Sequence, residues 1–266
     1  MAVSGLILCG SQAGLRKRNT SEMRDIIPTL NPGEVHIWTA RADPMAAPSV
    51  DFEVMLSQAE RDAANRFRFK KHSLMYVFAH GVLRDILSAY LRTGAAGIRF
   101  SRGAFGKPFL VDNGMRAPTS FNMSHSGNTV LIALAPGQCI GVDVEMIRPL
   151  ADFGLIAKSH FTPGERGILF RHAPEDQVRE FFRCWTRKEA FIKAVGKGLS
   201  IPLNSFDTSI PAGERGRRLA RTPDAPEIDS WWLADLELPC GYVGAVVVEK
   251  GCDRLVYSEW RPRGRG

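Results

Sequence analysis

Two acidic residues, Asp143 and Glu145, are spaced so that together they could hold a divalent cation. They lie on either side of a valine in the segment 139–145, which is expected to form a short β-strand. Because successive side chains of a strand point to opposite faces, both carboxylates share one face, while Val142 and Val144 face a core. Mg²⁺ is usually bound by one or two carboxylates together with substrate phosphates. The spacing also fits an ordinary exposed strand face, and the segment alone leaves both interpretations open.

A third carboxylate, Glu189, is expected on a helix over residues 176–195. It follows Trp185 by four residues and therefore lies on or beside the apolar face of that helix. A carboxylate among aromatic side chains is costly to bury unless it is paired or binds a metal ion. Lys193, another four residues on, could form a simple helix pair with Glu189, but such a pair does not explain the surrounding aromatic residues. Glu189 is therefore a candidate third metal ligand.

Ser124, His125 and Ser126 form a polar motif that invites a catalytic interpretation. A serine beside a histidine suggests the nucleophile and base of a hydrolase. Direct neighbours in a strand point to opposite faces, however, so Ser124 and His125 cannot easily form that pair. A lone histidine is more commonly a structural hydrogen-bonding residue than a ligand, which leaves a turn-stabilising role open for His125.

The elements that position these residues follow from hydrophobic periodicity and from capping signals. In the first half of the chain, Ser57 and Glu60 form a capping box that predicts the start of a helix. An apolar stripe at helical spacing predicts a longer second helix that ends before Gly94. In chain order, we expect a strand at 35–40 and helices at 57–67 and 71–92, followed by a strand at 107–111 and a turn at 112–114. We then expect strands at 130–135 and 139–145, joined by a hairpin turn at 136–137.

The second half repeats this order loosely. Thr162 and Glu165 form another capping box, with Pro163 at the first helical position. After the helix at 176–195, strands are expected at 231–236 and 243–249. The patterns predict an α+β fold of two similar lobes, each a small antiparallel sheet with packed helices. The expected boundaries are an N-terminal extension at 1–34, a first lobe at 35–140, a second lobe at 141–260 and a basic tail at 261–266.

The composition excludes several classes of protein. The chain has 266 residues, of which 44% are hydrophobic and 9% aromatic, enough for a sizeable core. No apolar run approaches the roughly 18 residues of a membrane helix, and the short apolar stretch before Cys9 has no basic residue before it, unlike a signal peptide. The five cysteines are scattered without C-x-x-C spacing, which argues against a disulfide framework or a zinc site and fits the cytoplasm.

The net charge of +7 suits nucleic acid, phosphate-rich small molecules or an acidic protein partner. Much of the excess falls in the segment 215–221 and in the tail 261–265, which are both expected to be solvated. Nucleic-acid binding would need aromatic and basic residues interleaved on one surface, and the tail has only Trp260 beside it. We therefore predict no nucleic-acid partner and no membrane association.

Three motifs, in matching order and spacing, resemble the 4′-phosphopantetheinyl transferases of the surfactin-synthetase-activating (Sfp-like) type. The resemblance covers about residues 50 to 210, and the third motif is long and specific. The motifs are Gly106-Lys107-Pro108 with Asn122-Met123-Ser124-His125-Ser126, then Gly141-Val142-Asp143-Val144-Glu145 for G-[IV]-D-x-E, and the segment 185–199 for W-x-x-K-E-[AS]-x-x-K-x-x-G-x-G-L. The helix start at 161–165 also resembles the family's F-[ST]-x-x-E.

The resemblance implies a pseudo-dimer of two α+β halves with the active site between the lobes and coenzyme A in that cleft. It implies a Mg²⁺-dependent enzyme of the holo-acyl-carrier-protein synthase kind. Such an enzyme transfers 4′-phosphopantetheine from coenzyme A to a serine of an apo acyl-, peptidyl- or aryl-carrier protein and releases 3′,5′-ADP. The carriers served are those of fatty-acid, polyketide and nonribosomal peptide synthesis. An internal pseudo-dimer also implies a monomer.

Carried over by position, the resemblance assigns roles to individual residues. Metal ligation falls to Asp143, Glu145 and Glu189. Catalytic roles fall to Glu189 as the base, to Lys193 as support for the phosphate and leaving group, and to His125 as a donor to a phosphate oxygen. Contacts to coenzyme A fall to Arg66, Lys70, Lys71, Lys107, Ser124, His125 and Lys193, although Lys107 could equally be solvated.

One position departs from the family. Members often carry a basic residue where this chain has Met75, close to the coenzyme A 3′-phosphate, and Lys70, Lys71 or His72 could substitute for it. Val144 cannot bind metal, so water would fill that coordination position. A non-catalytic module that only docks carrier domains is the main alternative, although no catalytic position is lost.

Overall fold

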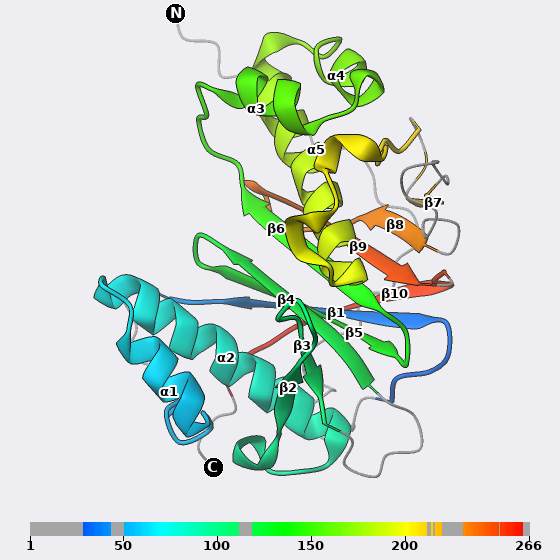
Figure 1. The fold of residues 1–266 in the computed structure, drawn as a ribbon. Coiled ribbons are helices and arrows are strands. Elements are labelled where there is room, and N and C mark those ends of the chain that lie inside the picture. The colour runs from blue at the N-terminus through cyan, green and yellow to red at the C-terminus, as the bar shows by residue number, and fades with distance from the viewer. Residues whose placement is uncertain are drawn as a thin grey trace, which may run out of the picture.

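Two four-stranded sheets form the centre of the structure, which is a computed structural model (Figure 1). The predicted turn at 112–114 lies outside the described residues, as do most of the predicted N-terminal extension and of the basic tail. The structure describes residues 29–43, 51–111, 119–211, 214, 216–219, 231–249 and 251–262.

The first sheet has the strand order β10-β1-β5-β4. Strand β5 is antiparallel to both of its neighbours, β1 and β4, whereas β10 runs parallel to β1. The predicted strand at 35–40 is confirmed as β1, and the predicted strand at 130–135 is confirmed as β5. The bounds are β1 Glu34–Arg41, β4 Thr119–Ser126, β5 Thr129–Pro136 and β10 Arg254–Glu259.

The second sheet has the strand order β6-β9-β8-β7, with every neighbouring pair antiparallel. It contains the strands predicted at 231–236 and 243–249. A separate two-stranded ribbon is formed by β2 and β3. The bounds are β6 Ile140–Met146, β7 Gly216–Arg218, β8 Trp231–Asp235, β9 Tyr242–Glu249, β2 Phe100–Arg102 and β3 Pro108–Leu110.

Two of the helices, α1 and α4, begin where the capping signals predict. Both capping boxes are formed, by Ser57 with Glu60 and by Thr162 with Glu165. Helix α5 ends before Gly196, whose positive φ of 74° suits a residue without a side chain. The bounds are α1 Gln58–Asn65, α2 Lys70–Leu91, α3 Phe153–His160, α4 Pro163–Leu169 and α5 Pro174–Val195, with single 3₁₀ turns at Ala95–Gly97, Gly198–Ser200 and Leu203–Ser205.

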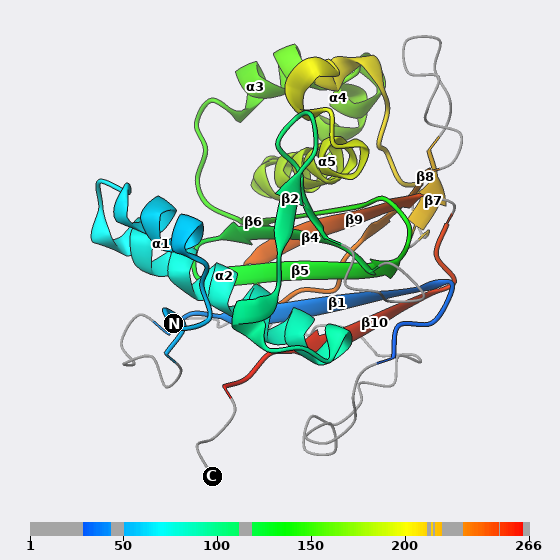
Figure 2. The same ribbon diagram turned by 60° about the horizontal axis from the view of Figure 1, so that its bottom comes forward.

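Side-chain alternation along the strands stacks the elements in layers. In β5, Val130 and Ile132 join the core under α2, while Leu131 and Ala133 join a second core with the apolar face of β6 and β9. The opposite face of the second sheet packs against α5, through contacts such as Phe191. The order is therefore helix, sheet, sheet, helix, and Figure 2 shows α3, α4 and α5 gathered on one side of the strands.

The predicted hairpin across the turn at 136–137 is wrong. Strand β6 does follow β5 closely, but it pairs with β9 in the other sheet, while β5 pairs with β1 and β4. Both strands are rich in buried apolar residues. Such a pattern indicates that a strand is buried, but it does not predict which strand is its hydrogen-bonding partner. The turn is a crossover between the two sheets.

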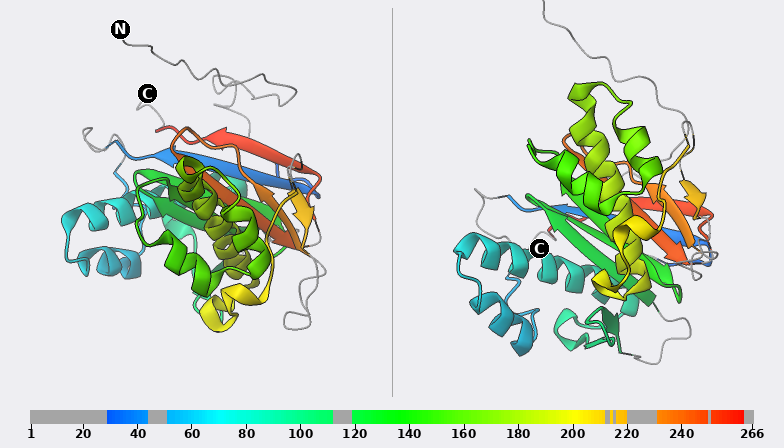
Figure 3. Two further views of the ribbon diagram at one scale, coloured as in Figure 1. Left: turned by 90° about the horizontal axis from the view of Figure 1, so that it is seen from above. Right: turned by 45° about the horizontal axis from the view of Figure 1, so that its top comes forward.

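Strand β10 belongs to the first sheet although it comes from the end of the segment predicted as the second lobe. Its residues pair with β1 from Glu34↔Arg254 to Thr39↔Glu259, and Figure 3 shows the two strands side by side. Trp260, which directly follows β10, packs under α2 and donates its indole N–H to Asp85 at 2.8 Å. The end of the described chain thus completes the core of the first half.

No helix among the described residues is long and apolar enough to cross a membrane.

Candidate active site

Strands β4 and β6 meet edge to edge at the junction of the two sheets, and side chains connect them. Ser124 donates its hydroxyl to Asp143 Oδ1 at 2.7 Å, and Ser126 donates to Glu145 Oε2 at 2.7 Å. Since both serines lie on one face of β4 and both carboxylates on one face of β6, the two pairs repeat at the strand period. The polar motif of β4 therefore orients the two carboxylates of β6.

A side chain of β4 also forms a hydrogen bond to the backbone of β6 at this junction. Asn122, which is buried, accepts a hydrogen bond from the backbone N–H of Val142 at 2.8 Å. His125 lies between the two serines and points to the opposite side, where it is exposed. The structure therefore separates His125 from its neighbours Ser124 and Ser126, as strand alternation predicted.

Helix α5 reaches this junction because β6 offers it a residue without a side chain. A Cβ atom on Gly141 would stand 2.1 Å from the carbonyl oxygen of Ala190 and 2.3 Å from the backbone N of Ala194. Only glycine allows so close an approach of helix to strand. This close approach places the part of α5 that carries Glu189 and Lys193 over the face of β6 that carries the two carboxylates.

Lys193 binds Asp143 from across this contact. Its ammonium lies 2.6 Å from Asp143 Oδ1 and 3.0 Å from Ser124 Oγ. The alternative of a simple ion pair within the helix, between Glu189 and Lys193, is therefore not the contact that the structure forms. Lys193 instead ties α5 to β6 and β4.

Asp143 is the most enclosed of the three acidic residues, with only 5% of its surface exposed. Burial raises the pKa of its carboxyl above the usual range, although the charge and hydrogen bond of Lys193 act against burial. The negative charge of Glu145 raises this pKa further. The second oxygen, Oδ2, is buried and has no hydrogen-bond partner. An unsatisfied carboxylate oxygen of this kind is a free position for a hard cation.

Glu189 is half-buried near the same pair. Burial raises the pKa of its carboxyl, and the charges of Asp143 and Glu145 raise it further. The positive charges of Lys193 and His160 lower it in part. The three acidic residues are thus close enough to disfavour one another's ionised form, which is the situation that a bound cation relieves.

The three carboxylates do not converge on one point in the structure. Within the described part of the chain, no group of three or more His, Cys, Asp or Glu side chains could hold one as they stand. The ammonium of Lys193 occupies the side of Asp143 Oδ1. The donor set therefore fits a divalent cation in its chemistry and in its free oxygen, and ligation by all three carboxylates would require their side chains to turn.

Lys107 has a contact that neither of its two predicted roles includes. Its ammonium donates to the carbonyl oxygens of Ile140 and Ala194, both at 2.9 Å. Burial lowers its pKa to about 8, against the opposing influence of Cys139. The alternative of a solvated side chain is therefore wrong. Lys107 joins the loop before β3 to the start of β6 and to the C-terminal end of α5, where carbonyl groups lack helical partners.

Three of the basic residues predicted to contact coenzyme A lie apart from the acidic junction in the chain. Arg66, Lys70 and Lys71 are exposed and lie around the turn between α1 and α2. Figure 1 places this turn at the same end of the molecule as the turn between β4 and β5. A surface pocket of about 260 Å³ opens beside it, lined by Ala63, Arg66, Phe67 and Tyr76.

Met75 packs against the core under α2, which explains why this position carries no basic residue here. The next residue, Tyr76, lines the pocket instead, and its ring stacks on His80 with centroids 4.0 Å apart. Nothing in the sequence singles out Tyr76, because an aromatic residue in an amphipathic helix usually belongs to the core.

Sequence reasoning also missed two basic residues beside the acidic cluster. Arg148 donates to Glu145 Oε2 at 3.0 Å, and its guanidinium lies over the ring of Phe182. His160, the last residue of α3, lowers the pKa of Glu189 and contacts Trp185 edge to face. Arg148 could have been found from its spacing of three residues after Glu145, whereas nothing in the local sequence connects His160 with α5.

An α+β protein in two halves, with acidic side chains and a lysine at their junction, has the features of a class of enzymes that act on phosphorylated substrates. Comparison with known proteins makes the class specific. The family model described as the 4′-phosphopantetheinyl transferase superfamily matches residues 139–243. The model described as the N-terminal part of 4′-phosphopantetheinyl transferase matches residues 43–137.

Curated relatives agree over most of the chain. It is 35% identical over 221 residues to the 4′-phosphopantetheinyl transferase HetI of Nostoc sp., an alignment that covers 83% of this chain and 90% of the relative. It is 33% identical over 202 residues to a putative 4′-phosphopantetheinyl transferase of Synechocystis sp., covering 76% and 79%. It is 32% identical over 195 residues to the 4′-phosphopantetheinyl transferase Sfp of Bacillus subtilis, covering 73% and 83%.

The chain belongs to the 4′-phosphopantetheinyl transferase superfamily. This confirms the predicted resemblance at the level of the superfamily. Together with the two-lobed α+β architecture, it also confirms the predicted fold.

Proposed function

We propose that this protein transfers the 4′-phosphopantetheine group of coenzyme A to a serine of an apo acyl-, peptidyl- or aryl-carrier domain, and that it is of the Sfp-like type. The observation that carries the proposal is the junction of β4, β6 and α5, where Ser124, Asp143 and Lys193 are bonded together. The relatives are transferases by name and align with both halves of the chain, so the junction lies inside the matched region.

Asp143, Glu145 and Glu189 are the residues that would hold Mg²⁺. The free Oδ2 of Asp143 and the mutual repulsion of the three carboxylates support this assignment. When bound, the ion would supply positive charge to the pyrophosphate of coenzyme A as negative charge develops there. Lys193, displaced from Asp143, would then be free to support the same phosphate groups.

The transfer itself needs a base and a fixed geometry. In the proposed step the carrier serine oxygen forms a bond to the β-phosphorus of coenzyme A, the bond from that phosphorus to the bridging oxygen breaks, and 3′,5′-ADP leaves. Glu189, whose raised pKa suits proton uptake, would take the serine proton directly or through water. The remaining contribution of the protein is positioning and electrostatic stabilisation.

Further residues, at the exposed rim of the proposed site, would contact coenzyme A. His125 is exposed and able to donate to a phosphate oxygen. Arg66, Lys70 and Lys71 form an exposed basic group for the coenzyme A 3′-phosphate, and the pocket at Arg66 offers an adjoining cavity. Lys107 keeps one ammonium hydrogen beyond its two carbonyl bonds, so a phosphate contact there stays a prediction. The monomeric state, the cytoplasmic location and the lack of a nucleic-acid partner also stay predictions.

The test is a transfer assay with coenzyme A, Mg²⁺ and a panel of purified apo carrier domains, read by intact-protein mass spectrometry. We expect one phosphopantetheine group to be added to at least one carrier and none to the same carrier with its acceptor serine changed to alanine. Chelation of Mg²⁺ should stop the transfer, and adding Mg²⁺ back should restore it. No mass gain on any carrier in the panel would contradict the proposal.

A further inference from the structure

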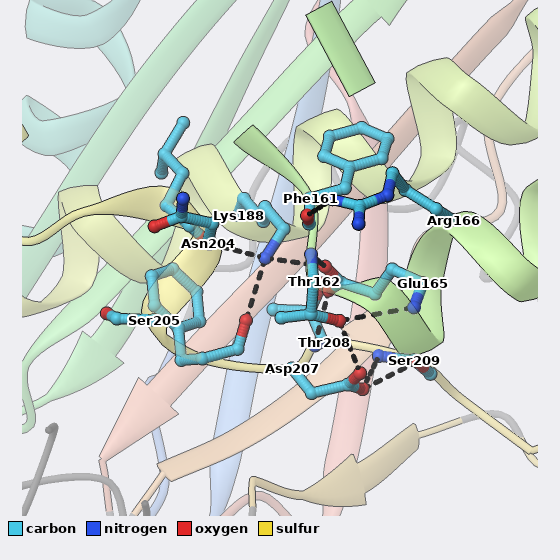
Figure 4. A network of polar contacts seen from close by, with 12 residues as sticks. Phe161, Thr162, Glu165, Arg166, Lys188, Asn204, Ser205, Asp207, Thr208 and Ser209 are labelled. Atoms are coloured by element: carbon cyan, nitrogen blue, oxygen red, sulfur yellow. Dashed lines mark hydrogen bonds and ion pairs between the residues drawn. The ribbon is translucent and has the colours of Figure 1, made fainter. Parts of the chain in front are cut away.

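Lys188 directly precedes Glu189 but points into the interior of the second half. Its side chain has no exposed surface, and its ammonium lies 2.8 Å from Glu165 Oε2. The ammonium also donates to the carbonyl oxygens of Leu203 at 2.6 Å and Phe206 at 2.8 Å (Figure 4). A lysine has three N–H donors, so all of them are used inside the protein.

Glu165 is enclosed in the same way, with 2% of its side chain exposed. Its Oε1 accepts from the backbone N–H of Thr208 at 2.7 Å and from the Thr208 hydroxyl at 2.8 Å. Its Oε2 accepts from the backbone N–H of Thr162 at 2.8 Å, which closes the capping box of α4. Both carboxylate oxygens are therefore occupied by protein donors.

The pair joins three segments that are distant along the chain. Glu165 belongs to the first turn of α4, Lys188 to the middle of α5, and the carbonyl groups to the loop 203–208. The rings of Phe161 and Phe206 lie over the ammonium, with centroids 5.9 and 4.5 Å away. Aromatic rings on two sides keep water out and bind the cation through their faces.

Stability alone does not account for such a pair. Taking two charges out of water is costly, and replacing a buried ion pair by apolar residues of similar size is often neutral or stabilising. What a buried pair with every donor and acceptor occupied does provide is a fixed direction for its side chains. Here it fixes the rotation of α5 about its own axis.

That rotation decides where the next residue points. Successive residues of an α-helix are turned by about 100°, so anchoring Lys188 on the inner side of α5 directs Glu189 toward the junction with β6. Lys193 follows Glu189 by four residues and lies on the same side of the helix. A small turn of α5 would move both side chains away from Asp143 together.

We propose that Lys188 and Glu165 are a buried positioning pair: they touch no substrate, and they hold α5 in the rotation that presents Glu189 and Lys193 to Asp143. The inference rests on the proposed function for its activity readout. It also predicts a structural effect on α5 that does not depend on which carrier is modified.

The experiment compares wild-type protein with Lys188→Met, Glu165→Gln and the double variant. Each single variant leaves one buried group without its partner, so its thermal midpoint should fall. The double variant removes both charges together, so its thermal midpoint should fall by less than the two single losses added together. Its kcat should nevertheless fall about tenfold or more, since small misplacements of catalytic groups have effects of this size. Its KM for coenzyme A should change less than about twofold, because rim contacts are untouched.

The control is Arg183→Met on the same helix. Arg183 pairs with Glu180 at 3.0 Å, half-exposed and away from Glu165, so its loss should leave kcat and KM unchanged. Hydrogen exchange supplies the second readout: backbone amides at 189–195 should exchange faster in the double variant than in the wild type, and not in Arg183→Met.

A folded double variant with wild-type kcat and wild-type exchange at 189–195 would overturn the inference while leaving the transferase assignment intact. If the double variant does not fold, Lys188→Arg replaces it. A planar guanidinium keeps the charge but cannot repeat the three ammonium bonds, so we expect a folded protein with reduced kcat. A folded Lys188→Arg variant with wild-type kcat would also overturn the inference that Lys188 and Glu165 position α5. A wild-type protein that modifies no carrier would instead contradict the proposed function, whatever the exchange data show.

Discussion

Asp143 is the residue at which burial, charge and hydrogen bonding conflict most. It is almost fully enclosed, one oxygen is held by Lys193 and Ser124, and the other oxygen has no partner. An ordinary structural carboxylate at that depth would have both oxygens satisfied. The imbalance supports the proposed Mg²⁺ ligation by Asp143 and makes the neighbouring acidic residues the place to test it.

Glu189→Gln should separate catalysis from stability. The change keeps the shape but removes the charge and the ability to accept the serine proton. We expect transfer to fall by roughly 10²–10⁴-fold, the usual contribution of a general base. The thermal midpoint should stay level or rise, because Asp143 and Glu145 would no longer face a third negative charge. Steady-state transfer and thermal unfolding measure the two effects.

Glu180→Gln is the matched control, since Glu180 lies on the same helix and forms an ion pair with the half-exposed Arg183 at 3.0 Å. It should keep full activity. Wild-type rates for Glu189→Gln would show that Glu189 is not the base.

Glu60 provides a pH-dependent prediction away from the site. Burial raises the pKa of its carboxyl, but hydrogen bonds from His80, Arg84 and Ser57 outweigh burial and lower the pKa from 4.5 to about 2. A carboxyl whose pKa is lowered on folding stabilises the protein fully above its unfolded value. That stabilisation, about 3 kcal/mol by the size of the shift, is lost as the pH falls from 4.5 to about 2.

Glu60→Gln should therefore destabilise the protein by about 3 kcal/mol at pH 7, because it leaves the buried Arg84 guanidinium without its partner. The difference from wild type should narrow below pH 4.5. Urea unfolding at several pH values measures it, with Glu53→Gln as an exposed control. A difference that stays constant down to pH 3 would contradict the assignment.

At the scale of elements, the contact between α5 and β6 depends on one missing side chain. Gly141→Ala would place a Cβ atom 2.1 Å from the Ala190 carbonyl oxygen, so α5 must move away. We expect a loss of about 1–3 kcal/mol of stability, typical of overpacking. Transfer activity should fall further than stability alone explains, because Glu189 and Lys193 move with the helix.

Gly167→Ala is the comparison for this change. Gly167 lies within α4, and a Cβ atom there would meet nothing within 4 Å. Alanine favours a helix over glycine by about 1 kcal/mol, so this variant should be as stable as wild type or more so, with full activity. Equal behaviour of the two variants would show that the close approach at Gly141 is unimportant.

The sequence was informative where the determinants are local. Capping boxes at Ser57 and Thr162 located two helix starts, and helical periodicity located α2 and α5. It failed at β6, because an alternating apolar strand fits either sheet and only tertiary packing selects β9 as its partner.

The candidate site divides in the same way. Strand alternation correctly placed Asp143 and Glu145 on one face and kept His125 apart from Ser124. The ion pair of Lys193 with Asp143 and the burial of Lys188 depend on how α5 lies against β6 and α4, which no spacing within the helix specifies.

At the scale of the whole molecule, the two halves share structural parts. Strand β10 pairs with β1 in the first sheet, although it follows β9 of the second sheet in the chain. Lys107 reaches from the loop before β3 to the carbonyl groups of Ile140 and Ala194. The halves therefore cannot unfold independently without breaking contacts in each other, and we expect a single cooperative transition.

Trp260→Ala tests this cooperativity. Trp260 follows β10, packs on Phe52 and Phe78 in the first core, and is 8% exposed. Its truncation should cost about 3–5 kcal/mol. If the halves unfold as one, the most protected backbone amides of β5 and of β9 should lose protection by this same free energy in native-state hydrogen exchange, although β9 belongs to the other sheet. Trp260→Phe keeps most of the apolar contact and loses the bond to Asp85, so it should cost less, again equally in both strands. Loss of protection confined to β5 would show that the first half unfolds by itself. Strand β10 would then not couple the unfolding of the two halves.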